Sequence, residues 1–125
     1  MKLHADPPHT SNTITAYGED YLEVNQQRYT HSLILMPQGQ VRHWPITHAT
    51  ELNAHHFELL ASTQPELVIL GSGKQHHFVH PSLFSVLTHL HIGVETMDTY
   101  AACRTYNILM AEGRHVLTAL ILEHH

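Results

Sequence analysis

The sequence has only one cysteine, no long apolar run and few basic residues, and each shortage argues against a class of protein. A single cysteine, Cys103, leaves no partner for a disulfide within the chain. No apolar stretch approaches the roughly 20 residues that a membrane-spanning helix needs. The first residues, MKLHADPP, lack the apolar core of a secretory signal peptide. We therefore expect a cytoplasmic protein that does not insert into a membrane.

Basic residues are outnumbered by acidic ones. Six Lys and Arg residues stand against 11 Asp and Glu residues, which gives a formal net charge of −5 at pH 7. Nucleic-acid binding relies on a basic surface that releases counterions, so nucleic acid is not an expected partner. The partner that this composition leaves open is another protein or a small molecule.

The length of 125 residues suits one domain. No repeat, low-complexity segment or linker divides the chain, so residues 1–121 are predicted to form a single domain. Residues 122–125, LEHH, resemble the start of an expression tag and are left out of the functional argument.

The first third of the chain reads as a series of short strands. Runs of β-favouring residues at 13–17, 21–24, 28–36 and 41–44 are separated by turn-forming residues. Such spacing predicts an antiparallel β-meander. Its exposed edges would allow a homodimer.

After Pro45 the pattern alternates between helices and strands. Helices are predicted at 53–61, from Pro81 onward and at 99–112, and strands at 66–70, 92–97 and 115–121. Strands joined by helices usually lie parallel in one sheet, so these three strands are expected to be neighbours. The chain is therefore an α/β protein with a mixed, partly parallel sheet, which the meander extends or packs against.

Three segments resemble one known family. They are Asn12–Gly18, Val68–Gly73 and Glu95–Leu109, the last of which contains the motif MDTYAACRTYN. Together they resemble the small Mth-type domain family, which includes the third mitochondrial complex I assembly factor and the adipogenesis-associated Mth-type domain protein. The resemblance implies a three-layer α/β fold, no established activity for bacterial members, and no metal chemistry. It also implies a stand-alone bacterial member, without the targeting segment of mitochondrial relatives.

A candidate site lies where two of the predicted parallel strands end. A glycine-rich turn follows the strand at 66–70, and a predicted helix cap follows the strand at 92–97, so both should meet at one edge of the sheet. Their proximity predicts a shallow pocket at this edge, which could bind an anion, a small molecule or a partner. The alternative is a tight turn with an internal hydrogen-bond network. The candidate residues are Gly71, Ser72, Gly73, Lys74, Asp98, Thr99, Arg104 and Asn107.

Cys103 is predicted to be a structural residue. It follows the first turn of the 99–112 helix, beyond the reach of the helix dipole that lowers a thiol pKa. Its spacing of three from Tyr106 and seven from Met110 puts it on the apolar side of the helix. A buried thiol is therefore the favoured interpretation, with a redox role as the alternative.

Histidines offer a metal site as a further alternative. His76, His77 and His80 lie in one predicted loop, and His55 and His56 lie in a predicted helix. No HExxH motif occurs, and no cysteine or obvious carboxylate ligand accompanies the loop. We predict solvated histidines, no metal site and no cofactor.

The function predicted from the sequence is a non-enzymatic protein-interaction or assembly-type domain. No Ser-His-Asp arrangement, nucleophile elbow or catalytic carboxylate pair stands out. The alternative is a protein that binds a small molecule or anion, with or without redox chemistry, at the 71–74 and 98–104 edge.

Overall fold

The centre of the fold is a five-stranded sheet in the computed structural model, which describes residues 11–123. Its strand order is β5-β4-β8-β6-β7. β6 is parallel to both β7 and β8, whereas β4 is antiparallel to β8 and β5. The predicted neighbours at 66–70, 92–97 and 115–121 are thus confirmed, with the first of them in the middle. The strands are β4 (Leu33–Leu35), β5 (Arg42–His43), β6 (Leu67–Gly71), β7 (Gly93–Met97) and β8 (Val116–Leu120).

A separate three-stranded sheet forms from the start of the chain. It contains β1 (Ile14–Gly18), β2 (Tyr21–Val24) and β3 (Gln27–Tyr29), all antiparallel. Asn25 and Gln26 join β2 to β3 with φ of 52° and 69°. Two successive residues with positive φ match the twist of a tight hairpin. The antiparallel meander is therefore confirmed for its first part.

The prediction of one strand over residues 28–36 is wrong. The structure divides this run into β3 and β4, which belong to different sheets. Ser32 lies between these two strands and is buried. Its Oγ donates to the Ile46 carbonyl and accepts the Leu122 N–H, so the buried hydroxyl is hydrogen-bonded within the protein. These bonds fix the point at which the chain passes from the three-stranded sheet to the five-stranded sheet. One continuous run of β-favouring residues therefore supplies a strand to each sheet. The meander consequently both extends the main sheet and packs against it.

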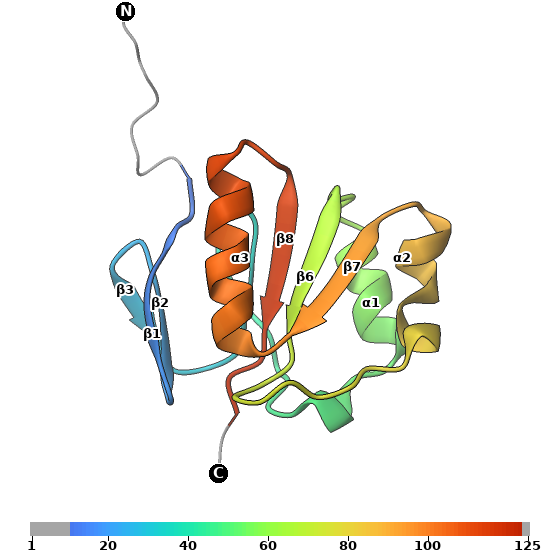
Figure 1. Cartoon of the computed structure of the whole chain (residues 1–125), viewed down its shortest axis with the longest axis horizontal. Coiled ribbons are helices and arrows are strands. Elements are labelled where there is room, and N and C mark those ends of the chain that lie inside the picture. Colours follow the sequence, from blue (N-terminus) through green and yellow to red (C-terminus); the bar gives the residue numbers. More distant parts are fainter. Residues whose placement is uncertain (1–10, 124–125) are drawn as a thin grey trace, which may run out of the picture.

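Helices cover both faces of the main sheet (Figure 1). α1 and α2 lie on one face, and α3 lies on the other beside the three-stranded sheet. This arrangement gives the three layers that the family resemblance implies. Asn53 caps α1 by accepting the His55 N–H at 2.9 Å, as the sequence predicts. The helical elements are η2 (Ala49–Glu51), α1 (Ala54–Ala61), η3 (Pro81–Phe84), α2 (Ser85–His89) and α3 (Thr99–Ala111).

The core has one part on each side of the main sheet. Phe57, Leu60 and Leu87 pack from α1 and α2 against one face. Cys103 and Tyr106 pack from α3 against the other, together with residues of the three-stranded sheet. Because β6 and β8 are covered on both faces, their sequences are nearly continuous apolar runs rather than alternating ones.

Two side chains of α3 attach the three-stranded sheet to the rest of the domain. The Tyr106 hydroxyl donates to the Asn12 carbonyl at 2.7 Å. The Asn107 amide donates to the Ile14 carbonyl at 2.8 Å and accepts the Ile14 N–H at 3.0 Å. Asn107 therefore substitutes for a neighbouring strand at the edge of β1.

None of the helices within residues 11–123 combines the length and apolar character needed to cross a membrane.

We expect Asn107→Ala to lower the free energy of unfolding by roughly 1–3 kcal/mol, because it leaves both the Ile14 N–H and C=O without their partner. Urea unfolding followed by the fluorescence of Trp44, the only tryptophan, measures this loss. The control is Ile108→Ala on the same helix, where the side chain is 60% exposed and a change within about 0.5 kcal/mol is expected. Equal midpoints for Asn107→Ala and the parent chain would contradict the proposed attachment.

Candidate functional site

The two halves of the predicted site do meet at one edge of the sheet. The Gly73 N–H donates to the Thr99 Oγ1 at 3.0 Å, and the Thr99 N–H donates to the Gly73 carbonyl at 2.8 Å. Thr99 Oγ1 in turn donates to the Ile121 carbonyl at 2.7 Å. One buried hydroxyl therefore joins the ends of β6 and β8 to the start of α3.

Two further polar side chains of the junction are used inside the protein. Ser72 is buried, and its Oγ donates to the Met97 carbonyl at 3.1 Å and accepts the His77 N–H at 2.9 Å. Asp98 caps α3 by accepting the Ala101 N–H at 2.9 Å. Neither side chain is placed as a free nucleophile or general base.

The glycine turn holds a carboxylate that belongs to the chain itself. Glu123 Oε1 accepts the Lys74 N–H at 2.8 Å. Gly73 has φ of +136°, and a Cβ there would lie 2.8 Å from the Glu123 Cδ. A Cβ on Gly71 would lie 2.9 Å from the Thr99 Cα, so both glycines allow close packing. The hollow beside Lys74, Thr99 and Glu123 measures about 10 Å³, and a more open one of about 250 Å³ lies beside Lys74, His77 and Glu123.

The predicted tag remnant begins inside this arrangement. Leu122 is buried, and Glu123 also accepts from His77 Nε2 at 3.2 Å, with His48 Nδ1 at 3.6 Å. Burial alone raises the pKa of Glu123, but the Lys74 N–H and the imidazoles of His77 and His48 outweigh it and lower the pKa. His124 and His125 lie outside the described residues.

Arg104 and Asn107 bond to residues of β1 rather than to the glycine turn. Arg104 Nη1 donates to the Tyr17 hydroxyl at 2.9 Å, and this bond holds the pKa of the guanidinium above its usual value. The Tyr17 ring stacks on Tyr100 with centroids 5.3 Å apart.

An ion pair lies beside the stacked rings. Lys74 Nζ is 3.2 Å from Glu19 Oε1, and both of these side chains line the same small hollow as Tyr100. We refer to Tyr17, Glu19, Lys74, Tyr100 and Arg104 as the Tyr17 cluster.

The remaining candidates have separate surroundings. Cys103 is fully buried, and burial raises the pKa of its thiol to about 12. His76 lies 3.3 Å from the Thr96 hydroxyl, whereas His80 accepts the Ser82 N–H and caps η3. Within residues 11–123, no three or more His, Cys, Asp or Glu side chains are arranged to hold a metal ion.

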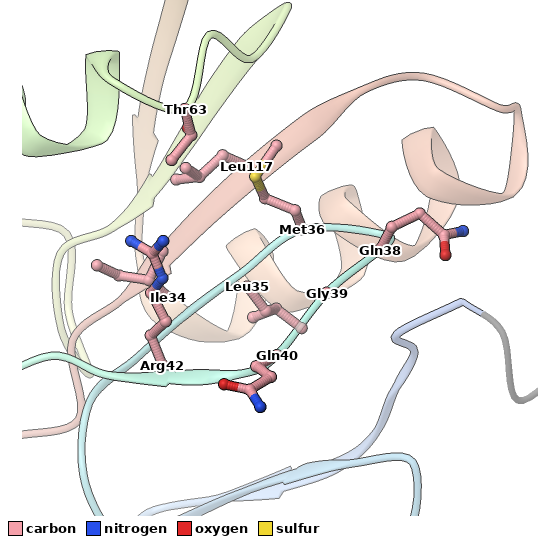
Figure 2. Close-up of a pocket in the computed structure, with 9 residues that line it drawn as sticks. All are labelled: Ile34, Leu35, Met36, Gln38, Gly39, Gln40, Arg42, Thr63 and Leu117. Carbon is pink, nitrogen blue, oxygen red and sulfur yellow. The ribbon is translucent and has the colours of Figure 1, made fainter.

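Sequence reasoning missed a groove on the opposite face of the main sheet (Figure 2). Two adjoining hollows of about 240 and 220 Å³ lie between the β4–β5 hairpin and the end of α1. They share the side chains of Ile34, Arg42, Thr63 and Leu117. We call this the β5 groove. These residues are far apart in sequence and match no motif, so the sequence carries no signal for the groove.

We expect Cys103 to resist thiol reagents in the folded protein. A pKa of about 12 instead of 9.0 reduces the thiolate fraction about a thousandfold near neutral pH. The measurement is the rate of reaction with a disulfide reagent at about pH 8, with the urea-unfolded chain as control. A folded chain that reacts as fast as the unfolded one would contradict the structural assignment of Cys103.

We expect Glu123→Gln to lower stability in a pH-dependent way. Because the folded pKa of Glu123 lies below the ordinary 4.5, its charge stabilises the fold above that pH, and this contribution is lost as the pH falls through the folded value. Gln keeps an acceptor for the Lys74 N–H but loses the charge and the second oxygen, which faces His77. Urea midpoints should therefore differ at about pH 7 and converge as the pH falls well below 4.5. A difference of the same size across this pH range would refute this account.

Comparison with known proteins places the chain in a family. The family model described as a protein of unknown function (DUF498/DUF598) matches residues 14–121. A curated relative, NADH dehydrogenase [ubiquinone] 1 alpha subcomplex assembly factor 3 of Mus musculus, is 30% identical over 110 residues, or 86% of this chain. The chain spans only 59% of that relative's length.

Solved structures give the same result for the fold. The crystal structure of a Bordetella parapertussis protein has a TM-score of 0.86 and 43% identity, covering 92% of this chain and 98% of that one. The solution structure of a Bordetella pertussis protein, described as a Mth938-like domain, has a TM-score of 0.83 and 37% identity, with coverages of 98% and 93%. The chain therefore belongs to the DUF498 family of unknown function and has the fold of a Mth938-like domain.

Proposed function

We propose that this chain is a non-enzymatic protein-interaction domain of the assembly-factor type. The name of the mouse relative supports an assembly role for that protein, and the shared family extends the idea to this chain. Its partner is another protein, and the cytoplasmic location expected from the sequence is part of the proposal.

The observation that carries the proposal is the Tyr17 cluster. Tyr and Arg, together with Trp, are enriched where protein interfaces derive their binding energy. Here the Arg104 guanidinium bonds to the Tyr17 hydroxyl, and the Tyr17 ring stacks on Tyr100. These contacts order long side chains before any partner arrives, which reduces the entropy lost on binding. Arg104 itself stays exposed and has further N–H donors to offer.

The interior of the same junction supports binding at the surface rather than catalysis. Ser72, Asp98 and Thr99 direct their polar atoms to the protein's own backbone, and Cys103 is sealed in the core. Of the eight candidate site residues, Lys74 and Arg104 are the exposed ones that would face a partner.

The test begins with capture of the partner from the organism's own cells on the immobilised chain, followed by affinity measurement with the purified pair. We expect Tyr100→Ala and Arg104→Ala each to weaken binding about tenfold or more. The matched control is Arg114→Ala, which removes an arginine paired with Glu66 after the far end of α3. Arg114→Ala should leave the affinity unchanged.

Two results would overturn the proposal. One is a parent chain that reproducibly retains no protein. The other is a partner whose affinity is unaffected by both Tyr100→Ala and Arg104→Ala, since its contact would then lie elsewhere on the domain.

A further inference from the structure

The β5 groove exists because α1 and α2 do not cover the whole face of the main sheet. These helices pack over the middle of the sheet, and the two hollows lie between the β4–β5 hairpin and the end of α1. Ile34 and Met36 remain half-buried there, above the fully buried Leu117. The result is an apolar floor that is partly open to solvent.

Arg42 stands over this floor. β4 pairs with β5 so that Ile34 lies opposite Arg42, which puts both side chains on the same face of the sheet. Figure 2 shows the Arg42 guanidinium beside Ile34, while Met36 points toward Leu117. Hydrocarbon surface and a positive charge are therefore next to each other.

Arg42 differs from the other cations of the described chain. Arg28, Lys74 and Arg114 each pair with a glutamate, and Arg104 binds a tyrosine hydroxyl. Across residues 11–123, Arg42 is the Lys or Arg side chain that has no hydrogen bond or ion pair to another side chain. Neither hollow of the groove is lined by an acidic residue, so the local charge is positive although the chain carries −5.

We propose that the β5 groove binds a small amphipathic monocarboxylate, with its hydrocarbon part on Ile34, Met36 and Leu117 and its carboxylate on Arg42. One unpaired guanidinium matches one negative charge, and its planar fork suits a carboxylate. The larger hollow of about 240 Å³ equals the liquid volume of roughly eight water molecules. It therefore suits a ligand of about eight to ten heavy atoms. This site is independent of the partner surface at the Tyr17 cluster.

The competing explanation for Arg42 is protection of a sheet edge. β5 ends the five-stranded sheet, and charged side chains on edge strands discourage pairing between molecules. That explanation predicts a solubility effect of Arg42 but no ligand selectivity. A binding experiment therefore separates the two.

The probe is sodium octanoate, titrated into the isotope-labelled full chain and followed by NMR. We expect saturable shifts of the Ile34, Met36 and Leu117 methyl signals and contacts between octanoate methylenes and the Met36 methyl. Octan-1-ol, which lacks the charge, should bind about tenfold or more weakly, and octylamine should not compete. The three probes separate recognition of the carboxylate from general apolar binding.

Arg42→Gln should weaken octanoate binding about tenfold or more, because it removes the ionic partner of the carboxylate. Arg28→Gln makes the same charge change in the three-stranded sheet and should leave binding unchanged. Thr63→Phe, which fills the groove from its rim, should abolish the shifts while the rest of the spectrum stays that of the folded chain.

Three results would overturn the proposal. They are the absence of saturable shifts at the groove, equal binding of octanoate and octan-1-ol, and unchanged octanoate affinity in Arg42→Gln. Any of these would leave edge protection as the role of Arg42, and none would affect the test of the Tyr17 cluster.

Discussion

The arrangement of the layers depends on the hydrogen bonds of Asn12. Its side-chain amide donates to the Met36 and Gly39 carbonyls, both at 2.8 Å, and its Oδ1 accepts from the Asn25 side chain at 3.0 Å. Its carbonyl accepts the Tyr106 hydroxyl. One buried residue thus connects α3, the β2–β3 turn and the turn that walls the β5 groove. Both N–H donors and the carbonyl oxygen of the Asn12 amide are used here, and among the side chains only Asn and Gln carry such an amide.

The glycine turn already binds a carboxylate of the chain through the Lys74 N–H. Backbone N–H groups at the carboxyl end of a parallel strand favour an anion, as the sequence predicts. The anion in this structure is the carboxylate of Glu123, which follows β8 and belongs to the predicted tag remnant. The glycine turn, which the sequence predicts as a ligand site, therefore links the segments that follow β6 and β8 in this structure. The surface beside it is left with paired charges and ordered tyrosines.

Local signals predicted most of the fold, and long-range contacts account for what was missed. Asn53 and Asp98 were recognisable as caps, and the parallel order of β6, β7 and β8 followed from the helices between them. The same rule placed residues 71–74 beside Asp98. The β-strand propensity of the residues could not show that residues 28–36 divide between two sheets, because both halves of this run favour strands. It also could not show that Arg104 reaches β1, or that α1 leaves β5 uncovered, since these depend on how whole elements pack.

The two surfaces lie on opposite sides of the main sheet, and the contacts between them argue that they act independently. The path between them runs from Arg104 along α3 to Tyr106, then through Asn12 to the 37–39 turn beside the groove. Movement along this path would break buried hydrogen bonds at a cost of about 1–3 kcal/mol each when a partner is left unpaired. Allosteric coupling between sites is typically about 1–3 kcal/mol in total. Breaking several such bonds would cost more than this usual coupling free energy, so we expect occupancy of the groove to leave α3 and the Tyr17 cluster in place.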